Sequence, residues 1–109
     1  MAGIGIIQRK ELRGKLATAL YAQYGRYTQV SSLINAFARS SPNADTEVPN
    51  QLYYLADAQK GYVTIRYDGG EPELVPMREA YVQLTAAGCN LVEGDIDDPG
   101  VIFGDGVRT

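Results

Sequence analysis

The chain of 109 residues, of which 45% are apolar and 21% charged, has the size and composition of one globular domain and is too short for a second. It contains no histidine, the commonest general base and zinc ligand, so we expect neither an enzyme nor a metal or cofactor site. The net charge of −3 is unevenly distributed, because residues 1–40 carry six basic residues and one acidic residue, whereas the others carry four basic and twelve acidic ones.

The first part of the chain predicts one amphipathic helix and no membrane segment. The N-terminal apolar run before Gln8 is far shorter than a signal-peptide core or a membrane span. Gly14 lies inside the predicted helix, where we expect it to allow close packing by a neighbouring helix. The helix is predicted over residues 8–24, with Gly25 as its stop, because apolar side chains recur every four residues: Leu12, Leu16, Leu20 and Tyr24.

Two more helices are predicted before the middle of the chain. Residues 28–40 should form the second, with the Thr28 hydroxyl as its cap and a Ser-Pro-Asn loop after it. Residues 45–60 should form the third, with Asp45 as its cap and Pro49 in or near its first turn. The third helix is predicted from apolar side chains at helical spacing: Val48, Leu52, Leu55 and Ala56.

The composition changes after Gly61 and predicts a two-stranded ribbon. Residues 62–67 are rich in β-branched and aromatic side chains, which favour a strand. Residues 68–70, Asp-Gly-Gly, predict a turn, and residues 71–77, with two prolines, predict a loose exposed excursion. Alternating side chains then predict a returning strand over residues 80–84.

A last helix and an acidic tail complete the chain. Thr85 should cap a short helix over residues 86–93. Cys89, the chain's one cysteine, lies in this helix, where we expect it to act as a small buried hydrophobe. Because no intrachain disulfide can form, we expect the protein in a reducing, cytoplasmic compartment. Residues 95–109 are acidic and glycine-rich but interrupted by apolar side chains, so we expect a tail that packs on the body or on a partner.

Three helices, a β-hairpin and a short C-terminal helix, in this chain order, are typical of the winged helix-turn-helix fold. Residues 48–63 are similar to the recognition helix of winged-helix regulators running into the first wing strand, and Leu84-Thr85-Ala86-Ala87-Gly88 resembles the Leu-Thr-x-x-Gly that closes their wing. The compact size, Leu91-Val92-Glu93-Gly94 and Asp98-Pro99-Gly100-Val101 resemble small winged-helix proteins of Mu-like prophages. We therefore expect an α+β winged-helix domain over residues 1–94 and a tail over 95–109.

The resemblance implies a transcriptional regulator, with a phage or prophage as one source, that binds double-stranded DNA. Its third helix would enter the major groove, and its wing would contact backbone or minor groove. A helical wheel with Val48, Leu52 and Leu55 inside turns five side chains outward: Thr46, Glu47, Asn50, Gln51 and Tyr54. Asn50 and Gln51 could bind adenine, and Thr46 and Tyr54 could reach phosphates. Further candidate DNA contacts are Arg26, Arg39, Arg66 and Arg78.

Charge leaves a second function open. Residues 45–60 contain three acidic residues and one basic residue, whereas phosphate neutralisation supplies most non-specific DNA affinity. A DNA-binding surface would need basic residues from the first two helices: Arg9, Lys10, Arg13, Lys15, Arg26 and Arg39. The alternative is a winged-helix protein-interaction or assembly module, whose apolar tail docks on a protein partner or on a second copy in a homodimer.

Overall fold

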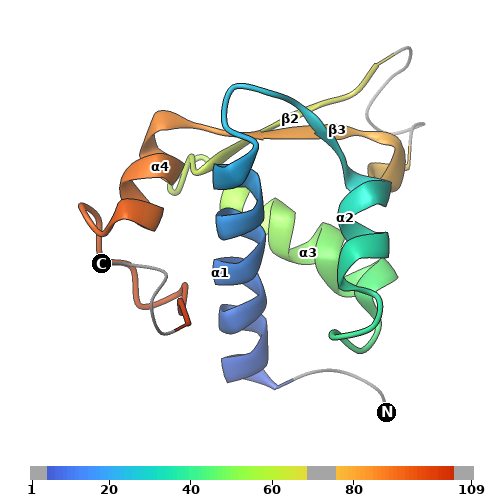
Figure 1. Ribbon diagram of the computed structural model, residues 1–109, viewed down its shortest axis with the longest axis horizontal. Helices are drawn as coiled ribbons and strands as arrows, with labels where there is room; N and C mark the ends of the chain where they lie inside the picture. The colour runs from blue at the N-terminus through green and yellow to red at the C-terminus, as the bar shows by residue number, and fades with distance from the viewer. Residues whose placement is uncertain (1–4, 69–75, 105–109) are drawn as a thin grey trace.

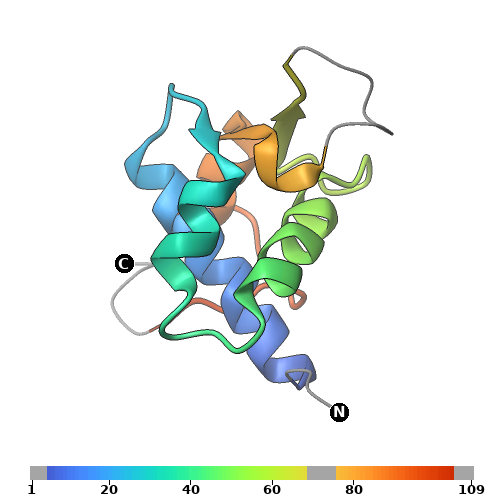
Figure 2. The same cartoon turned by 90° about the vertical axis from the view of Figure 1, so that its right-hand side faces the viewer.

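The computed structural model describes residues 5–68 and 76–104, and over these residues the protein is α+β (Figure 1). They form four α-helices, one short 3-10 helix and a small three-stranded antiparallel sheet. α1 stands in the middle, with α4 on one side and α2 and α3 on the other, and the sheet crosses one end of these helices (Figures 1 and 2). In chain order the elements are α1 (Ile6–Ala22), β1 (Thr28–Gln29), α2 (Val30–Phe37), α3 (Ala44–Ala56), β2 (Val63–Arg66), η1 (Met77–Glu79), β3 (Tyr81–Leu84) and α4 (Ala86–Glu93).

α1 confirms the first predicted helix, although it begins and ends two residues before the predicted limits. Its three leucines are buried as predicted, but Tyr24 lies beyond the helix and is 53% exposed. Because α1 ends at Ala22, the helical spacing does not fix the direction of the Tyr24 side chain. Within the described residues, no helix has the length and apolarity needed to cross a membrane.

The second predicted helix, over residues 28–40, is shorter at both ends, because its first two residues belong to the sheet and α2 ends at Phe37. Thr28 does not cap a helix: Thr28 and Gln29 form β1, and α2 begins at Val30. β1 pairs with β3, which sets Thr28 opposite Val82. A β-branched threonine suits a strand, but Thr28 forms one only by pairing with Val82, which is distant in the sequence. Local sequence preference could not predict that pairing.

α3 confirms the third predicted helix but differs from the prediction at its ends. Its N-terminal cap is Asn43, with a left-handed φ of 56°, whereas Asp45 lies in the first turn. Pro49 lies in the helix interior, not in the first turn. The helix ends at Ala56, four residues before the predicted limit. Its inner face is as predicted, because three of the four apolar side chains are buried: Val48, Leu52 and Leu55.

The sheet has the order β1-β3-β2, and it confirms both predicted strands to within one residue at each end. β2 pairs antiparallel with β3, so that Val63 faces Leu84 and Arg66 faces Tyr81. Val63 and Leu84 are buried, whereas Arg66 is exposed, so one face of the sheet covers the helices. Most of the predicted turn and excursion falls on residues 69–75, which lie outside the described residues.

The last helix and its cap are confirmed. The Thr85 hydroxyl accepts a hydrogen bond from the Gly88 amide (3.1 Å), which satisfies one free N–H of the first turn of α4. Gly94 ends α4 with a φ of 89°, in the left-handed region that favours glycine. The chain then returns toward α1 (Figure 1).

The C-terminal strap, defined as residues 98–103, packs on the body of the protein. Arg13 Nη1 donates to the Gly100 carbonyl (2.9 Å), and the Ile102 amide donates to a carbonyl of α1 (3.0 Å). The Ile102 carbonyl lies where a Cβ at Gly14 would be, so Gly14 admits the strap and not a neighbouring helix as predicted. The tail was expected to pack either on the body or on a partner, and its described residues pack on the body.

Candidate interaction surface on the third helix

One exposed stripe of side chains runs along α3, the predicted recognition helix. We call it the α3 stripe: its first three members lie within α3, spaced by four and three residues on one helix face, and its fourth member is the C-terminal cap of α3. It contains no basic residue, and Asp45, beside its first member, is also exposed. The two predicted DNA contacts Thr46 and Asn50 therefore face solvent as expected. The α3 stripe consists of Thr46, Asn50, Tyr53 and Asp57.

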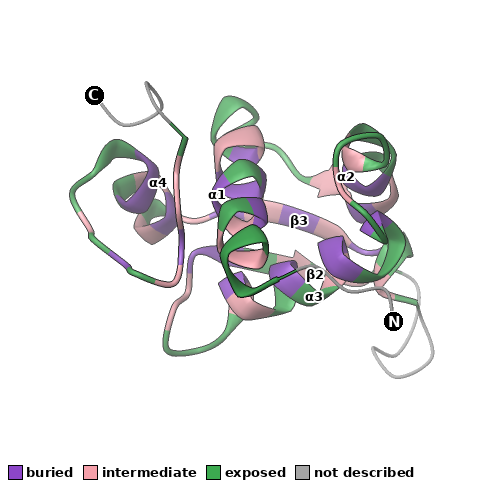
Figure 3. Cartoon of the chain, turned by 90° about the horizontal axis from the view of Figure 1, so that it is seen from below, coloured by how far each residue is buried: buried purple, intermediate pink, exposed green. Residues whose placement is uncertain are grey.

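Glu47 and Gln51 do not point outward as predicted, because they are 5% and 4% exposed. Gln51 accepts a hydrogen bond from Arg13 Nε (2.7 Å) and donates to Glu47 Oε1 (3.1 Å). Glu47 also pairs with Arg9 Nε at 3.4 Å. α1 and α3 each have buried residues, which are purple in Figure 3. The two polar side chains belong to the contact between these helices, so Gln51 is not available to read a base.

Tyr54, predicted to reach phosphates, is half-buried and packs inside the protein. The Arg13 guanidinium lies 3.6 Å from the centre of its ring, and Lys60 Nζ lies 5.3 Å from the same centre. A cation over an aromatic face is attracted by the ring quadrupole. Tyr54 therefore holds α1 against α3 and leaves the outer surface to the α3 stripe.

Basic side chains near α3 are mostly engaged within the protein. Lys60 donates to Asp98 (2.9 Å), in addition to the contacts of Arg9 and Arg13. Arg66, a predicted DNA contact, pairs with Asp68 (2.9 Å) on the sheet. The other three predicted arginines are exposed and form no ion pair within the described residues, but they lie at separate places: Arg26 before β1, Arg39 after α2 and Arg78 in η1.

An open groove of about 530 Å³ lies between α1 and α3. Its floor includes the Glu47–Gln51–Arg13 contacts, and three members of the α3 stripe form its rim. It is a polar surface groove and not an enclosed site for a small apolar ligand. The lining residues are Arg9, Arg13, Glu47, Asn50, Gln51, Tyr53, Tyr54 and Asp57.

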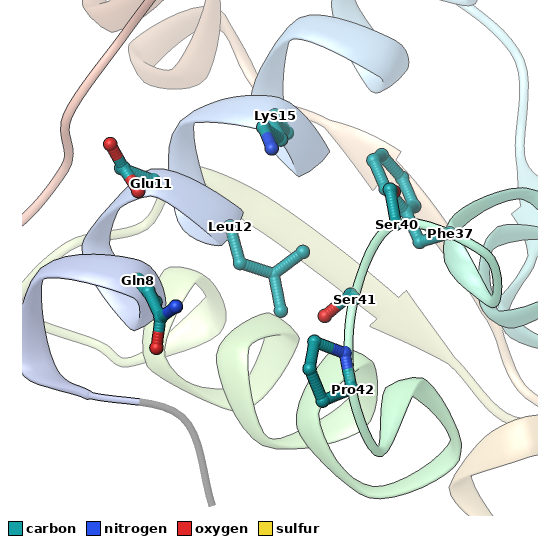
Figure 4. Close-up of a pocket in the computed structure, with 8 residues that line it drawn as sticks. All are labelled: Gln8, Glu11, Leu12, Lys15, Phe37, Ser40, Ser41 and Pro42. Carbon is teal, nitrogen blue, oxygen red and sulfur yellow. The ribbon is translucent and has the colours of Figure 1, made fainter.

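A second, smaller hollow lies between α1 and the loop from α2 to α3 (Figure 4). Its volume is about 120 Å³, well below the roughly 300–1,000 Å³ of most small-molecule sites. Leu12 projects into it from α1, and Lys15 and Glu11 stand along the same helix. Although Glu11 and Lys15 carry charges, the hollow is too small for most ligands, so we assign it none. It is lined by Gln8, Glu11, Leu12, Lys15, Phe37, Ser40, Ser41 and Pro42.

Three of the groups with a shifted pKa, Lys60, Tyr62 and Asp98, hold the strap on the body of the protein. The pKa of Tyr62 is raised to about 12, mainly by burial and secondly by the hydrogen bond that its hydroxyl donates to Asp98 (2.7 Å). Burial by itself would raise the pKa of Asp98, but three hydrogen bonds outweigh it and lower that pKa overall. Within the described residues, no three potential ligands gather to hold a metal ion. The three groups that donate to Asp98 are the Tyr62 hydroxyl, Lys60 Nζ and the Gly100 amide.

The two amides predicted to read bases should differ in their effect on stability. Replacing Gln51 by alanine should lower the free energy of unfolding by about 1–3 kcal/mol, because Arg13 Nε and the buried Glu47 carboxylate each lose a partner. The matched change Asn50→Ala, on the exposed stripe, should change it by less than about 0.5 kcal/mol. Urea denaturation of both variants measures the difference, and equal effects would contradict this placement of Gln51.

The described residues thus present a polar, partly acidic helix face beside a groove, with most neighbouring cations already paired. An exposed helix face and an open groove offer contact area without enclosing a substrate, which is unlike the concave pocket of a small-molecule site. No family model matches the chain, and no curated protein or solved structure matches it either.

Proposed function

We propose that this chain is a winged-helix domain that works by binding another protein through its third helix. The element order supports the fold, since α1, β1, α2 and α3 precede a hairpin, and the sheet has the order β1-β3-β2. In this proposal β2 and β3 form the wing and α3 is the recognition helix. A phage or prophage source stays a prediction.

One observation carries the choice of a protein partner: the surface of α3 has carboxylates and no free cation. Asp45 and Asp57 are exposed, and neither forms an ion pair within the described residues. Arg9 and Arg13, the nearest cations on α1, are engaged with side chains of α3. DNA binding depends on neutralising phosphates, so this face would repel a duplex.

DNA binding is the second candidate, and the exposed Asn50 and Thr46 favour it. An asparagine amide can bind adenine in the major groove, and a threonine hydroxyl can reach a phosphate. In that case the phosphate contacts would come from exposed basic residues away from α3, such as Lys15, Arg26, Arg39 and Arg78. The transcriptional regulator implied by the sequence resemblance corresponds to this candidate.

Fluorescence anisotropy with a pool of duplexes of randomised sequence separates the two functions. We expect the unmodified protein to show no binding at about 0.15 M salt. The double variant Asp45→Lys, Asp57→Lys should gain binding that weakens with salt at a log-log slope near −2, because each new phosphate contact contributes about −0.9. The control variant Glu93→Lys, Asp95→Lys changes the net charge by the same amount on another surface, and it should gain no DNA binding. Salt-dependent binding by the unmodified protein would favour DNA as the ligand.

Site-specific photocrosslinking in the producing cell tests for the partner itself. A benzophenone amino acid at Tyr53 should give a discrete adduct with a protein, which mass spectrometry then identifies. The same probe at Ala86, which is exposed on α4, should not give that adduct. An adduct with nucleic acid at Tyr53, or the same protein adduct at both positions, would contradict the proposed function.

A further inference from the structure

Tyr53 and Asp57 form a pair of groups on the α3 stripe that is open to solvent. Tyr53 lies in the last turn of α3 and Asp57 is its C-terminal cap, and both line the groove between α1 and α3. The Tyr53 hydroxyl lies 3.3 Å from that of Tyr67, and the residue is 53% exposed. One Asp57 carboxylate oxygen accepts a hydrogen bond from the Gln59 amide (2.8 Å). Within the described residues, no cation lies over the Tyr53 ring and none pairs with Asp57.

The same combination holds an arginine elsewhere in this protein. The Arg66 guanidinium lies 4.2 Å from the centre of the Tyr27 ring and pairs with Asp68 at 2.9 Å. A guanidinium suits this arrangement because it is planar, stacks on aromatic faces and donates to a carboxylate. Tyr53 and Asp57 supply an aromatic ring and a carboxylate for which the described chain provides no cation.

We infer that the partner places an arginine side chain between the Tyr53 ring and the Asp57 carboxylate, an assignment that rests on the proposed function. The partner is then a protein with a basic segment. Asn50, one turn earlier on the stripe, can donate to and accept from the backbone of that segment. The rise from Asn50 to Asp57 is about 10 Å, which an extended segment covers with about three residues. Arginine is favoured over lysine because stacking and pairing act on the same planar group.

An NMR titration with defined peptides tests this assignment. The probe is acetyl-Gly-Ser-Arg-Gly-Ser-amide, and its matched control carries citrulline, which keeps the shape of arginine and lacks the charge. We expect the arginine peptide to shift the amide signals of residues 50–57, and the citrulline peptide to leave them in place. Asp57→Asn and Tyr53→Leu should each weaken binding about two- to fivefold, whereas Tyr53→Phe, which keeps the ring, should bind as the unmodified protein does.

Asp95→Asn is the matched control, because it removes one exposed carboxylate outside the stripe and should leave binding unchanged. Equal weakening by Asp95→Asn and Asp57→Asn would mean a general attraction to an acidic protein and would overturn the assignment. Concentration-dependent shifts of the same amides without peptide, lost in Asp57→Asn, would make a second copy the occupant and overturn it too. If the peptide fails to bind while the Tyr53 crosslink still captures a protein, this inference fails and the proposed function stands.

Discussion

Replacing Asp98 by alanine is expected to lower the free energy of unfolding by about 3 kcal/mol, because a buried, charged acceptor of several hydrogen bonds is lost. The side chain is 7% exposed, and its removal leaves the Tyr62 hydroxyl buried without its acceptor. It also detaches the strap from Lys60. Chemical denaturation measures the loss, with Asp95→Ala, an exposed change nearby, as the control expected to stay within about 0.5 kcal/mol.

The contribution of Asp98 should depend on pH in a defined direction. Its pKa is lowered in the folded protein, so the stabilisation is present above the ordinary value of 3.8 and disappears as the pH falls below it. The pKa of Tyr62 is raised from 10.0 to about 12, so stability should also fall as the pH rises through that interval. In Asp98→Asn the acid-induced part of this profile should be smaller, and an unchanged profile would contradict the role of the carboxylate.

The second large effect concerns Leu52, which is fully buried on the inner face of α3. Leu52→Ala should lower the free energy of unfolding by about 2–5 kcal/mol, since it removes buried apolar contact and leaves a cavity. That is a large share of the roughly 5–15 kcal/mol by which such domains are stable. Thermal or urea denaturation gives the value.

Tyr53→Ala, one residue later and on the exposed side of α3, is the control for Leu52→Ala. Tyr53 is 53% exposed and its hydroxyl bond to Tyr67 is at the surface, so we expect a loss of less than about 1 kcal/mol. A larger loss for Tyr53 than for Leu52 would mean that α3 presents the other face to the core. The proposed binding surface would then be on the wrong side of the helix.

Arg13 connects the groove to the strap, which gives the two parts of the structure a common element. Its guanidinium donates to Gln51 on α3 and to the Gly100 carbonyl in the strap, and it covers the Tyr54 ring. Loss of the Asp98 contacts should therefore loosen the floor of the groove as well as the strap. The shape of the α1–α3 groove depends on residues far apart in the sequence.

The sequence by itself determined the four helices, two of the three strands and the apolar inner face of α3. Three buried positions of α3 were predicted from their spacing, and the cap at Thr85 was predicted from its hydroxyl next to a helical segment. Both predictions depend on local geometry, because a helix of 3.6 residues per turn fixes which side chains share a face, and a cap needs only the next few residues. The exposed positions of Thr46 and Asn50 follow from the same spacing.

Only the tertiary structure decided which polar side chains are free. Gln51 and Glu47 flank the apolar face of α3, and they are buried because Arg9 and Arg13 approach them from α1, 38 residues earlier. The strand at Thr28 and the strap contact at Gly14 were missed for the same reason. A sequence period gives the direction of a side chain within its own element, whereas burial of a polar group depends on a distant partner that satisfies its hydrogen bonds.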